Sequence, residues 1–260
     1  MTEILLEAVG LTKRFGALLV TDNISLRLPR GARHALIGPN GAGKSTLVGL
    51  LSGTLAPDAG RVSLAGTDIT SLAPHRRVKR GLARTYQINS QFPQLTVLEN
   101  VLLAVSEAHG ASRHLFRSAF AHKELIARAE ALVAELGLGD ERHWPVAKIS
   151  YGKQRIVEIA LALALEPKVL LLDEPAAGIP GDEMARVLDV IARLPAEMAI
   201  LIIEHDMKIV RQFAREVTVL VNGAVFMSGA PADVMASPEV RAVYLGRAAG
   251  AQERSAHGHS

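Results

Sequence analysis

Hydrophobic and polar residues alternate loosely near the start of the chain, at residues 4–11 and 18–28, with Arg14-Phe15-Gly16 between the two runs. Both runs are rich in Leu and Val, and alternation with a period of two is typical of strands with one buried face. We therefore predict two antiparallel strands joined by a turn. Shorter strands are expected at residues 34–37 and 61–64. The pattern indicates an N-terminal antiparallel β subdomain.

The hydrophobic period changes to that of a helix between residues 99 and 136, where Ala, Leu, His, Arg and Glu dominate. Leu125, Ala129 and Leu132, for example, recur at spacings of three or four residues, which places them on one helix face. A second helix with the same spacing follows Ser150. We expect a helical subdomain over residues 88–165, inserted between two α/β parts.

Continuous apolar runs return in the last third of the chain, at residues 169–172 and 199–203, on either side of a helical pattern at 182–194. Strands that are apolar on both faces and alternate with helices are typical of a parallel sheet covered by helices. A terminal hairpin is expected at residues 217–227, with Asn222-Gly223 as its turn. The predicted fold class is α/β with a mostly parallel sheet.

The composition is that of a folded protein, with 49% hydrophobic and 21% charged residues in a chain of 260. We expect one domain over residues 1–247 and a flexible C-terminal tail at residues 248–260. The chain has no cysteine, which excludes disulfides, thiol nucleophiles and cysteine–zinc sites. No apolar run reaches the length of a membrane span, and the acidic start does not fit an export signal.

The charge balance gives no reason to expect a nucleic-acid partner. Lys and Arg total 29 against 26 Asp and Glu, a formal net charge of +3. The one strong basic cluster, His75 to Arg80, has no interleaved aromatic residues. We interpret it as the solvated face of a helix.

The segment GPNGAGKST lies between the strand expected at 34–37 and a helix expected at 44–51, which is the setting of a phosphate-binding P-loop. Glycines let successive backbone N–H groups turn toward phosphate oxygens, and the helix adds the positive end of its dipole. Lys44 is expected to reach the β- and γ-phosphates, and Ser45 to bind Mg²⁺. The residues expected to contact the nucleotide here are Gly38, Pro39, Asn40, Gly41, Ala42, Gly43, Lys44, Ser45 and Thr46.

Two adjacent acids, Asp173 and Glu174, follow the apolar strand at 169–172. In a protein with a P-loop, an acid at such a strand end can hold Mg²⁺, which assigns that role to Asp173. Glu174 is then placed to orient a water for attack on the γ-phosphate, since a general base has to lie within hydrogen-bond reach of that water.

Ser150-Tyr151-Gly152-Lys153-Gln154 opens the helix that follows it. Ser150 could be a simple N-cap, or its hydroxyl could join the amide groups at the helix N-terminus in binding a phosphate. With this segment added to the P-loop and the two acids, the chain resembles the ATP-binding subunits of ABC transporters over about residues 4–247. The resemblance implies a P-loop NTPase core, in which 1–247 form the ATP-binding domain, and ATP and Mg²⁺ as cofactors.

The resemblance also assigns roles to individual residues. Phe15 falls where the family stacks an aromatic ring on adenine, although a single Phe is more often a core residue. Gln87 matches the glutamine that reaches the Mg²⁺ and the attacking water, and His205 matches the switch histidine that contacts the γ-phosphate. The resemblance implies that Ser150, Gly152 and Gln154 contact the ATP bound to a partner subunit. The expected catalytic residues are Glu174, His205, Gln87 and Lys44, and the expected metal ligands are Ser45, Gln87 and Asp173.

Three positions depart from the commonest family pattern. Tyr151 and Lys153 replace other residues of the signature segment, and Lys153 places a cation where the helix dipole disfavours it. Pro180 stands where the family commonly has Asp or Asn, so the polar side chain that would cross a dimer interface is missing. We expect weak coupling between the two ATP sites of a dimer.

Four short patterns resemble the ATP-binding subunits of importers for branched-chain and other hydrophobic amino acids. They are Ser150-Tyr-Gly152, Ala176-Ala-Gly178, Glu204-His-Asp-Met207 and Val243-Tyr-Leu-Gly246. Urea, amide or aromatic-compound import is the alternative within this group. The resemblance implies integral membrane permease subunits, a second ATP-binding subunit (commonly a different chain), an extracytoplasmic solute-binding protein, and a peripheral place on the cytoplasmic face of the inner (plasma) membrane.

Two other classes stay open. One is a soluble ABC-type ATPase that works on DNA or ribosomes, but such proteins usually have a long coiled-coil insertion or two cassettes in one chain. The other is a small-molecule kinase with a P-loop, which has no need of the segment from Ser150 to Gln154 or of His205.

Overall fold

A computed structural model of the protein describes residues 3–85, 91–110 and 123–243. The chain divides into unit 1, made of residues 1–71 and 200–260, and unit 2, made of residues 72–199. Within the described ranges, no helix combines the length and the hydrophobicity needed to cross a bilayer. The predicted tail at 248–260 and the loop with Gln87 lie outside the described residues.

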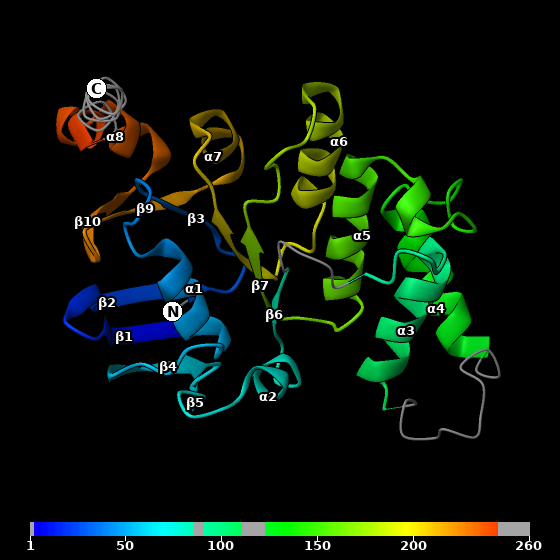
Figure 1. Ribbon diagram of the computed structural model, residues 1–260, viewed down its shortest axis with the longest axis horizontal. Helices are drawn as coiled ribbons and strands as arrows, with labels where there is room; N and C mark the ends of the chain where they lie inside the picture. Colours follow the sequence, from blue (N-terminus) through cyan, green and yellow to red (C-terminus); the bar gives the residue numbers. More distant parts are fainter. Residues whose placement is uncertain (1–2, 86–90, 111–122, 244–260) are drawn as a thin grey trace, which may run out of the picture. The chain divides into compact units, whose positions relative to one another are not determined.

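Unit 1 contains the predicted antiparallel β subdomain, a four-stranded sheet in the order β2-β1-β4-β5. Its long hairpin pairs Leu6 with Leu28 and extends to Phe15 opposite Leu18, so β1 runs four residues beyond the predicted end at Leu11. Gly16 makes the turn with a φ of 59°. The strands are β1 (Ile4–Phe15), β2 (Leu18–Pro29), β4 (Ala59–Leu64) and β5 (Thr67–Asp68) (Figure 1).

The second sheet of unit 1 has the order β10-β9-β3-β8. Strand β3 pairs in parallel with both β8 and β9, and β10 turns back antiparallel to β9 through Asn222-Gly223, as predicted. Every residue of β8 is buried, which fits its continuous apolar sequence. The strands are β3 (Arg33–Ile37), β8 (Ala199–Ile203), β9 (Glu216–Val221) and β10 (Ala224–Gly229).

Three helices of unit 1 cover these sheets: α1 (Lys44–Ser52), α7 (Met207–Phe213) and α8 (Pro231–Ala236). Helix α1 packs against β1 and β2, and α7 packs against β3. Only α1 was predicted, and the sequence pattern missed α7 and α8 because each is at most seven residues long. Two turns are too short to show a helical period clearly.

Unit 2 is largely helical and carries one parallel strand pair, β6 with β7. All five residues of β7 are buried. Helix α3 packs against α4 and α5, and α5 packs against α6 (Figure 1). The elements are α2 (Pro74–Val78), β6 (Leu82–Arg84), α3 (Val97–Ala108), α4 (Lys123–Glu135), a 3-10 turn (Val146–Lys148), α5 (Tyr151–Leu163), β7 (Val169–Asp173) and α6 (Gly181–Ala192).

Helix α3 of unit 2 begins at a local polar signal. Thr96 accepts a hydrogen bond from the Glu99 amide and the Glu99 carboxylate accepts from the Thr96 amide, which forms a capping box at the start of α3.

The basic cluster from His75 to Arg80 falls on α2 and the turn after it. Its interpretation as a wholly solvated face is wrong for Arg77, which is buried and donates to the Leu72 carbonyl.

Candidate functional site

The loop between β3 and α1 contains glycines at positions where a side chain cannot fit. A Cβ at Gly38 would lie 2.3 Å from the Leu220 carbonyl oxygen, and one at Gly43 would lie 2.6 Å from the Val20 carbonyl oxygen. Both glycines also have positive φ angles, 152° and 97°. Close packing against neighbouring backbone thus fixes the curled path of this loop.

Lys44 is held against the loop that it follows. Its ammonium donates hydrogen bonds to the carbonyl oxygens of Gly38, at 2.6 Å, and Pro39, at 3.1 Å. Helix α1 begins at Lys44 without a side-chain cap, and Ser45 is exposed in its first turn. Backbone amides at an uncapped helix start, a lysine ammonium and a hydroxyl form the donor set that a phosphate group requires.

The turn of the β9–β10 hairpin supports the P-loop, a role that the sequence alone did not reveal. Gly223 donates from its amide to the Ala42 carbonyl at 3.1 Å, and its own carbonyl accepts from the Asp22 amide at 2.8 Å. Asn222-Gly223 could be read as a hairpin turn from its sequence. Its contact with a loop about 180 residues earlier could not, because no local pattern encodes it.

Phe15 is 48% exposed at the end of β1 and is therefore not a core residue. The Lys13 ammonium lies 5.8 Å from the centre of its ring. An exposed aromatic ring can stack on a ligand, and the contact of Phe15 with adenine stays a prediction.

His205 and the P-loop leave the same edge of the parallel sheet. Leu36 of β3 pairs with Ile203 of β8, and Gly38 and His205 each follow two residues after these partners. The His205 side chain is 63% exposed, whereas the preceding Glu204 is buried and accepts from the His205 amide at 3.2 Å. Within unit 1 the fold thus places the predicted switch histidine at the strand edge from which the P-loop begins.

Asp173 and Glu174 belong to unit 2, at the end of β7. The Asp173 carboxylate accepts a hydrogen bond of 2.7 Å from Arg84 of β6, and its backbone amide donates to the Thr85 hydroxyl at 3.4 Å. Glu174 has a φ of 45°, in the left-handed region that a non-glycine residue rarely occupies. Strained backbone of this kind persists where the surrounding structure fixes a side chain in a required direction.

The segment from Ser150 to Gln154 also belongs to unit 2, at the start of α5. Ser150 occupies the N-cap position, but its hydroxyl does not cap the helix, so its interpretation as a simple N-cap is wrong. The Glu183 carboxylate accepts a hydrogen bond from the Gly152 amide at 2.8 Å. The Ser150 side chain and the Gly152 amide together hold the pKa of Glu183 below its usual value. Gln154 donates to the Ile149 carbonyl at 3.0 Å.

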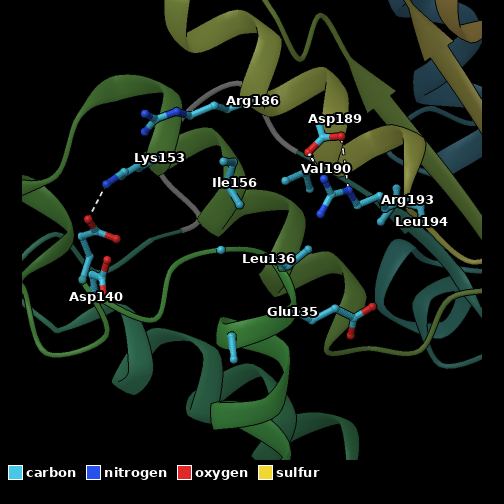
Figure 2. Close-up of a pocket in the computed structure, with 13 residues that line it drawn as sticks. Glu135, Leu136, Asp140, Lys153, Ile156, Arg186, Asp189, Val190, Arg193 and Leu194 are labelled. Carbon is cyan, nitrogen blue, oxygen red and sulfur yellow. Dashed lines mark hydrogen bonds and ion pairs between the residues drawn. The ribbon is translucent and has the colours of Figure 1, made fainter.

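The two departures in this segment have partners in unit 2. Tyr151 lies against Gly178, where an added Cβ would be 3.5 Å from its ring, and its hydroxyl accepts from Arg155 at 2.7 Å. Lys153 forms an ion pair with Glu141, and both residues line a pocket of about 560 Å³ that Arg186 also lines (Figure 2). The Glu141 carboxylate offsets the unfavourable position of the Lys153 cation at the start of the helix.

The sequence-predicted residues thus fall into two groups. Unit 1 carries Phe15, the P-loop and His205, and unit 2 carries Asp173, Glu174 and the segment from Ser150 to Gln154. Sequence reasoning missed the tertiary contacts of Arg84, Glu183 and Gly223. Their partners are far away in the chain, and no short motif marks these contacts.

Comparison with known proteins identifies the family. The family model of ABC transporters matches residues 21–177. The high-affinity branched-chain amino acid transport ATP-binding protein BraF of Pseudomonas aeruginosa is 34% identical over 255 residues, covering 95% of this chain and 100% of BraF. The corresponding Escherichia coli protein, LivG, is likewise 34% identical, with the same coverage of both chains.

Solved structures agree with this match. The ADP conformation of an ATP-binding cassette from an ABC transporter superposes with a TM-score of 0.84 and 29% identity, covering 94% of this chain and 100% of that one. A nucleotide-free cassette superposes with a TM-score of 0.82, also at 29% identity, covering 93% and 98%. The predictions of family and fold class are confirmed: the chain belongs to the ABC transporter family and is one of its ATPase cassettes.

Proposed function

We propose that the chain hydrolyses ATP to energise an importer of branched-chain amino acids. The match of this chain along the full length of BraF and LivG is the observation that supports branched-chain amino acids as the substrate class. A ribose import protein of Streptomyces avermitilis is 36% identical, but this chain spans only 46% of that protein. Sequence identity to these relatives therefore does not separate branched-chain amino acid import from ribose import. The match along the whole length of BraF and LivG favours branched-chain amino acids. Urea, amide or aromatic-compound import is the alternative within the same group.

The proposed chemistry assigns one task to each predicted residue. The amides of the P-loop and the Lys44 ammonium bind the phosphates, and Phe15 stacks on the adenine. Glu174 orients a water in line with the γ-phosphate, while Lys44 and His205 offset the charge that develops on the phosphate oxygens. Gln87 contacts the metal and the attacking water.

Magnesium fits the donors that the chain offers. Within the described residues, no group of three or more His, Asp or Glu side chains could hold a metal by itself. Mg²⁺ in nucleotide sites is typically bound through one or two carboxylates, with phosphate oxygens and waters among the remaining ligands. Ser45, Asp173 and Gln87 would supply the protein oxygens, and the ion would neutralise phosphate charge when bound.

The proposed assembly pairs two ATP-binding subunits head to tail, so that Ser150, Gly152 and Gln154 of one subunit contact the ATP held by the P-loop of the other. In the assembled importer we favour a different chain as the partner. Permease subunits in the membrane would form the transport path, and an extracytoplasmic solute-binding protein would deliver the solute. The chain would then sit peripherally on the cytoplasmic face of the inner membrane. A soluble ABC ATPase without permeases is the alternative that fractionation tests.

The deciding experiment measures uptake of labelled leucine and labelled urea in cells that carry either the wild-type chain or Lys44→Ala. Loss of the ammonium should weaken ATP binding, measured by calorimetry, and abolish uptake of the transported solute. Lys208→Ala, which removes an exposed lysine of α7, is the matched control and should leave uptake intact. Loss of urea uptake without loss of leucine uptake would show that the importer transports urea or amides rather than branched-chain amino acids. Unchanged uptake of both solutes, with no protein in the membrane fraction, would exclude the transport function.

A further inference from the structure

The carboxylate of Glu183 occupies the hydrogen-bond donors at the start of α5. It accepts from the Gly152 amide at 2.8 Å, and the Ser150 side chain is the largest cause of its lowered pKa. Both residues are among those that the proposed function assigns to the partner subunit's ATP. A carboxylate and a phosphate are both anions that accept from helix-terminal amides, so they compete for the same groups.

Gly152 is the residue that lets the carboxylate approach. A Cβ at this position would lie 2.7 Å from Glu183 Oε2 and 2.9 Å from Glu183 Cβ. Any side chain at position 152 would therefore displace Glu183 from the amide. The absence of a side chain at Gly152 thus makes the contact between its amide and the Glu183 carboxylate possible.

Two cations act electrostatically on the carboxylate. Lys153 and Arg186 both act electrostatically on Glu183 and help to lower its pKa, after the larger effects of Ser150 and Gly152. Both cations line one pocket of unit 2 (Figure 2). If Glu183 left, the Gly152 amide and the Arg186 cation would lose this anion, while Lys153 would keep its ion pair with Glu141.

We propose that Glu183 is a resident anion that stands in for the phosphate of a partner's ATP and has to leave before the ATP-bound dimer closes. This inference rests on the proposed head-to-tail pairing of two ATP-binding subunits. Glu183 lies on α6, directly after the loop that follows Glu174, so its release would also free one end of that loop. The contact thus raises the ATP concentration at which two subunits associate.

The test uses the full chain in a Glu174→Gln background, so that bound ATP is not consumed. Dimer formation is followed by analytical ultracentrifugation while Mg²⁺-ATP is titrated, with and without Glu183→Ala or Glu183→Gln. Glu183→Ala should reach half-maximal dimer at roughly tenfold lower ATP, the size expected for one hydrogen bond to a charged group. Glu183→Gln keeps an acceptor oxygen but loses the charge, so its shift should be smaller, about threefold.

Asp189→Asn is the matched control, because Asp189 is an exposed acid of the same helix whose ion-pair partner is Arg193. Asp189→Asn should leave the ATP concentration for half-maximal dimer formation unchanged. If Glu183 served only to stabilise the start of α5, its loss would lower the melting temperature and weaken the dimer, which is a shift of opposite sign. An unchanged or weakened dimer in both Glu183 variants would overturn the inference.

The same experiment separates this inference from the proposed function. ATP binding by the monomer depends on Lys44 and does not involve Glu183. A dimer that forms in no variant, while Lys44-dependent ATP binding persists, would overturn the inference and leave the ATPase function standing. Absence of ATP binding in every variant would instead reject the proposed function itself.

Discussion

Arg84 and Asp173 form a largely buried ion pair with a hydrogen bond of 2.7 Å, and their side chains are only 16% and 8% exposed. Arg84 pairs with Leu171 in the register of β6 and β7, so its guanidinium reaches the carboxylate two residues further along. Arg84 also stands three residues before Gln87. The Arg84 guanidinium therefore neutralises the carboxylate of Asp173, the residue proposed to bind Mg²⁺. Arg84 ends the strand that precedes the predicted position of Gln87.

Arg84→Met should destabilise the protein because it leaves the Asp173 carboxylate largely buried without its partner. Breaking a fully buried pair costs several kcal/mol, and the partial exposure of Arg84 reduces our expectation to about 2 kcal/mol. Urea unfolding measures this cost. In an Asp173→Asn background the same substitution should cost much less, since no charge is left unpaired. Equal costs in the two backgrounds would show that the ion pair does not contribute.

Glu174→Gln should keep ATP binding but lose about 10²- to 10⁴-fold in turnover, the range for loss of a general base. The amide has the shape of the carboxylate but cannot accept the proton of the attacking water. Glu166→Gln is a close control, because Glu166 is another glutamate of unit 2 with a positive φ, 52° against 45° for Glu174. Turnover is measured by phosphate release at saturating ATP. Near-normal turnover in Glu174→Gln would remove this residue from the catalytic assignment.

His34 should make the stability of unit 1 depend on pH. Burial lowers the pKa of His34 to about 4, although the Glu216 carboxylate lies 3.7 Å from its Nδ1 atom. The unfolded chain, with an ordinary histidine pKa near 6.5, then binds more protons than the folded chain between about pH 4 and 6.5. The stability that the neutral His34 allows is fully present above pH 6.5 and is lost as the pH falls toward 4, by at most about 3.4 kcal/mol.

His34→Gln removes the titrating ring while keeping a group that can hydrogen-bond to Thr218, which lies 2.9 Å from Nε2 of the wild-type ring. The free energy of unfolding of this variant should change less between pH 6.5 and 4 than that of the wild type. The exposed His75 provides the control, His75→Gln. An identical pH slope in wild type and His34→Gln would contradict the assigned pKa shift.

The parts of the fold that could be predicted are those encoded within a few neighbouring residues. The P-loop needs its glycines, lysine and hydroxyl in one short run, and β7 is recognisable from four consecutive apolar residues. The contacts of Arg84 and Glu183 are different, because their partners lie 89 and 31 residues away. Both are ordinary charged residues whose roles appear only when the fold brings the partner to them.

The departures from the family pattern also have structural partners that the sequence alone could not predict. From the sequence, Lys153 was a cation in an unfavourable position, and the structure supplies Glu141 as its partner. Tyr151 could be noted as unusual, but its packing against Gly178 depends on a loop that follows another strand. Local sequence thus identified where the signature segment differs, and tertiary contacts explain why the differences are tolerated.

Pro180 provides the last prediction, which concerns communication between two ATP sites. Its carbonyl accepts from the amides of Glu183 and Met184, both at 3.0 Å, which makes it the N-cap residue of α6. Its side chain offers no polar group to a partner subunit. We therefore expect the wild-type chain to hydrolyse ATP with a Hill coefficient near one, because a polar bridge between the two sites is missing at this position.

Pro180→Asp should raise the cooperativity of ATP hydrolysis without harming the fold. The φ and ψ of −56° and 146° at this position suit an aspartate N-cap, whose side chain can accept from amides of the first helical turn. The gain of a cap, typically about 1 kcal/mol, is similar in size to the loss of the proline's restriction of the unfolded chain. Pro180→Ala removes the proline without adding a polar group, so it should leave cooperativity at the wild-type level. A wild-type Hill coefficient already near two, or equal cooperativity in both variants, would show that residue 180 does not limit communication between the sites.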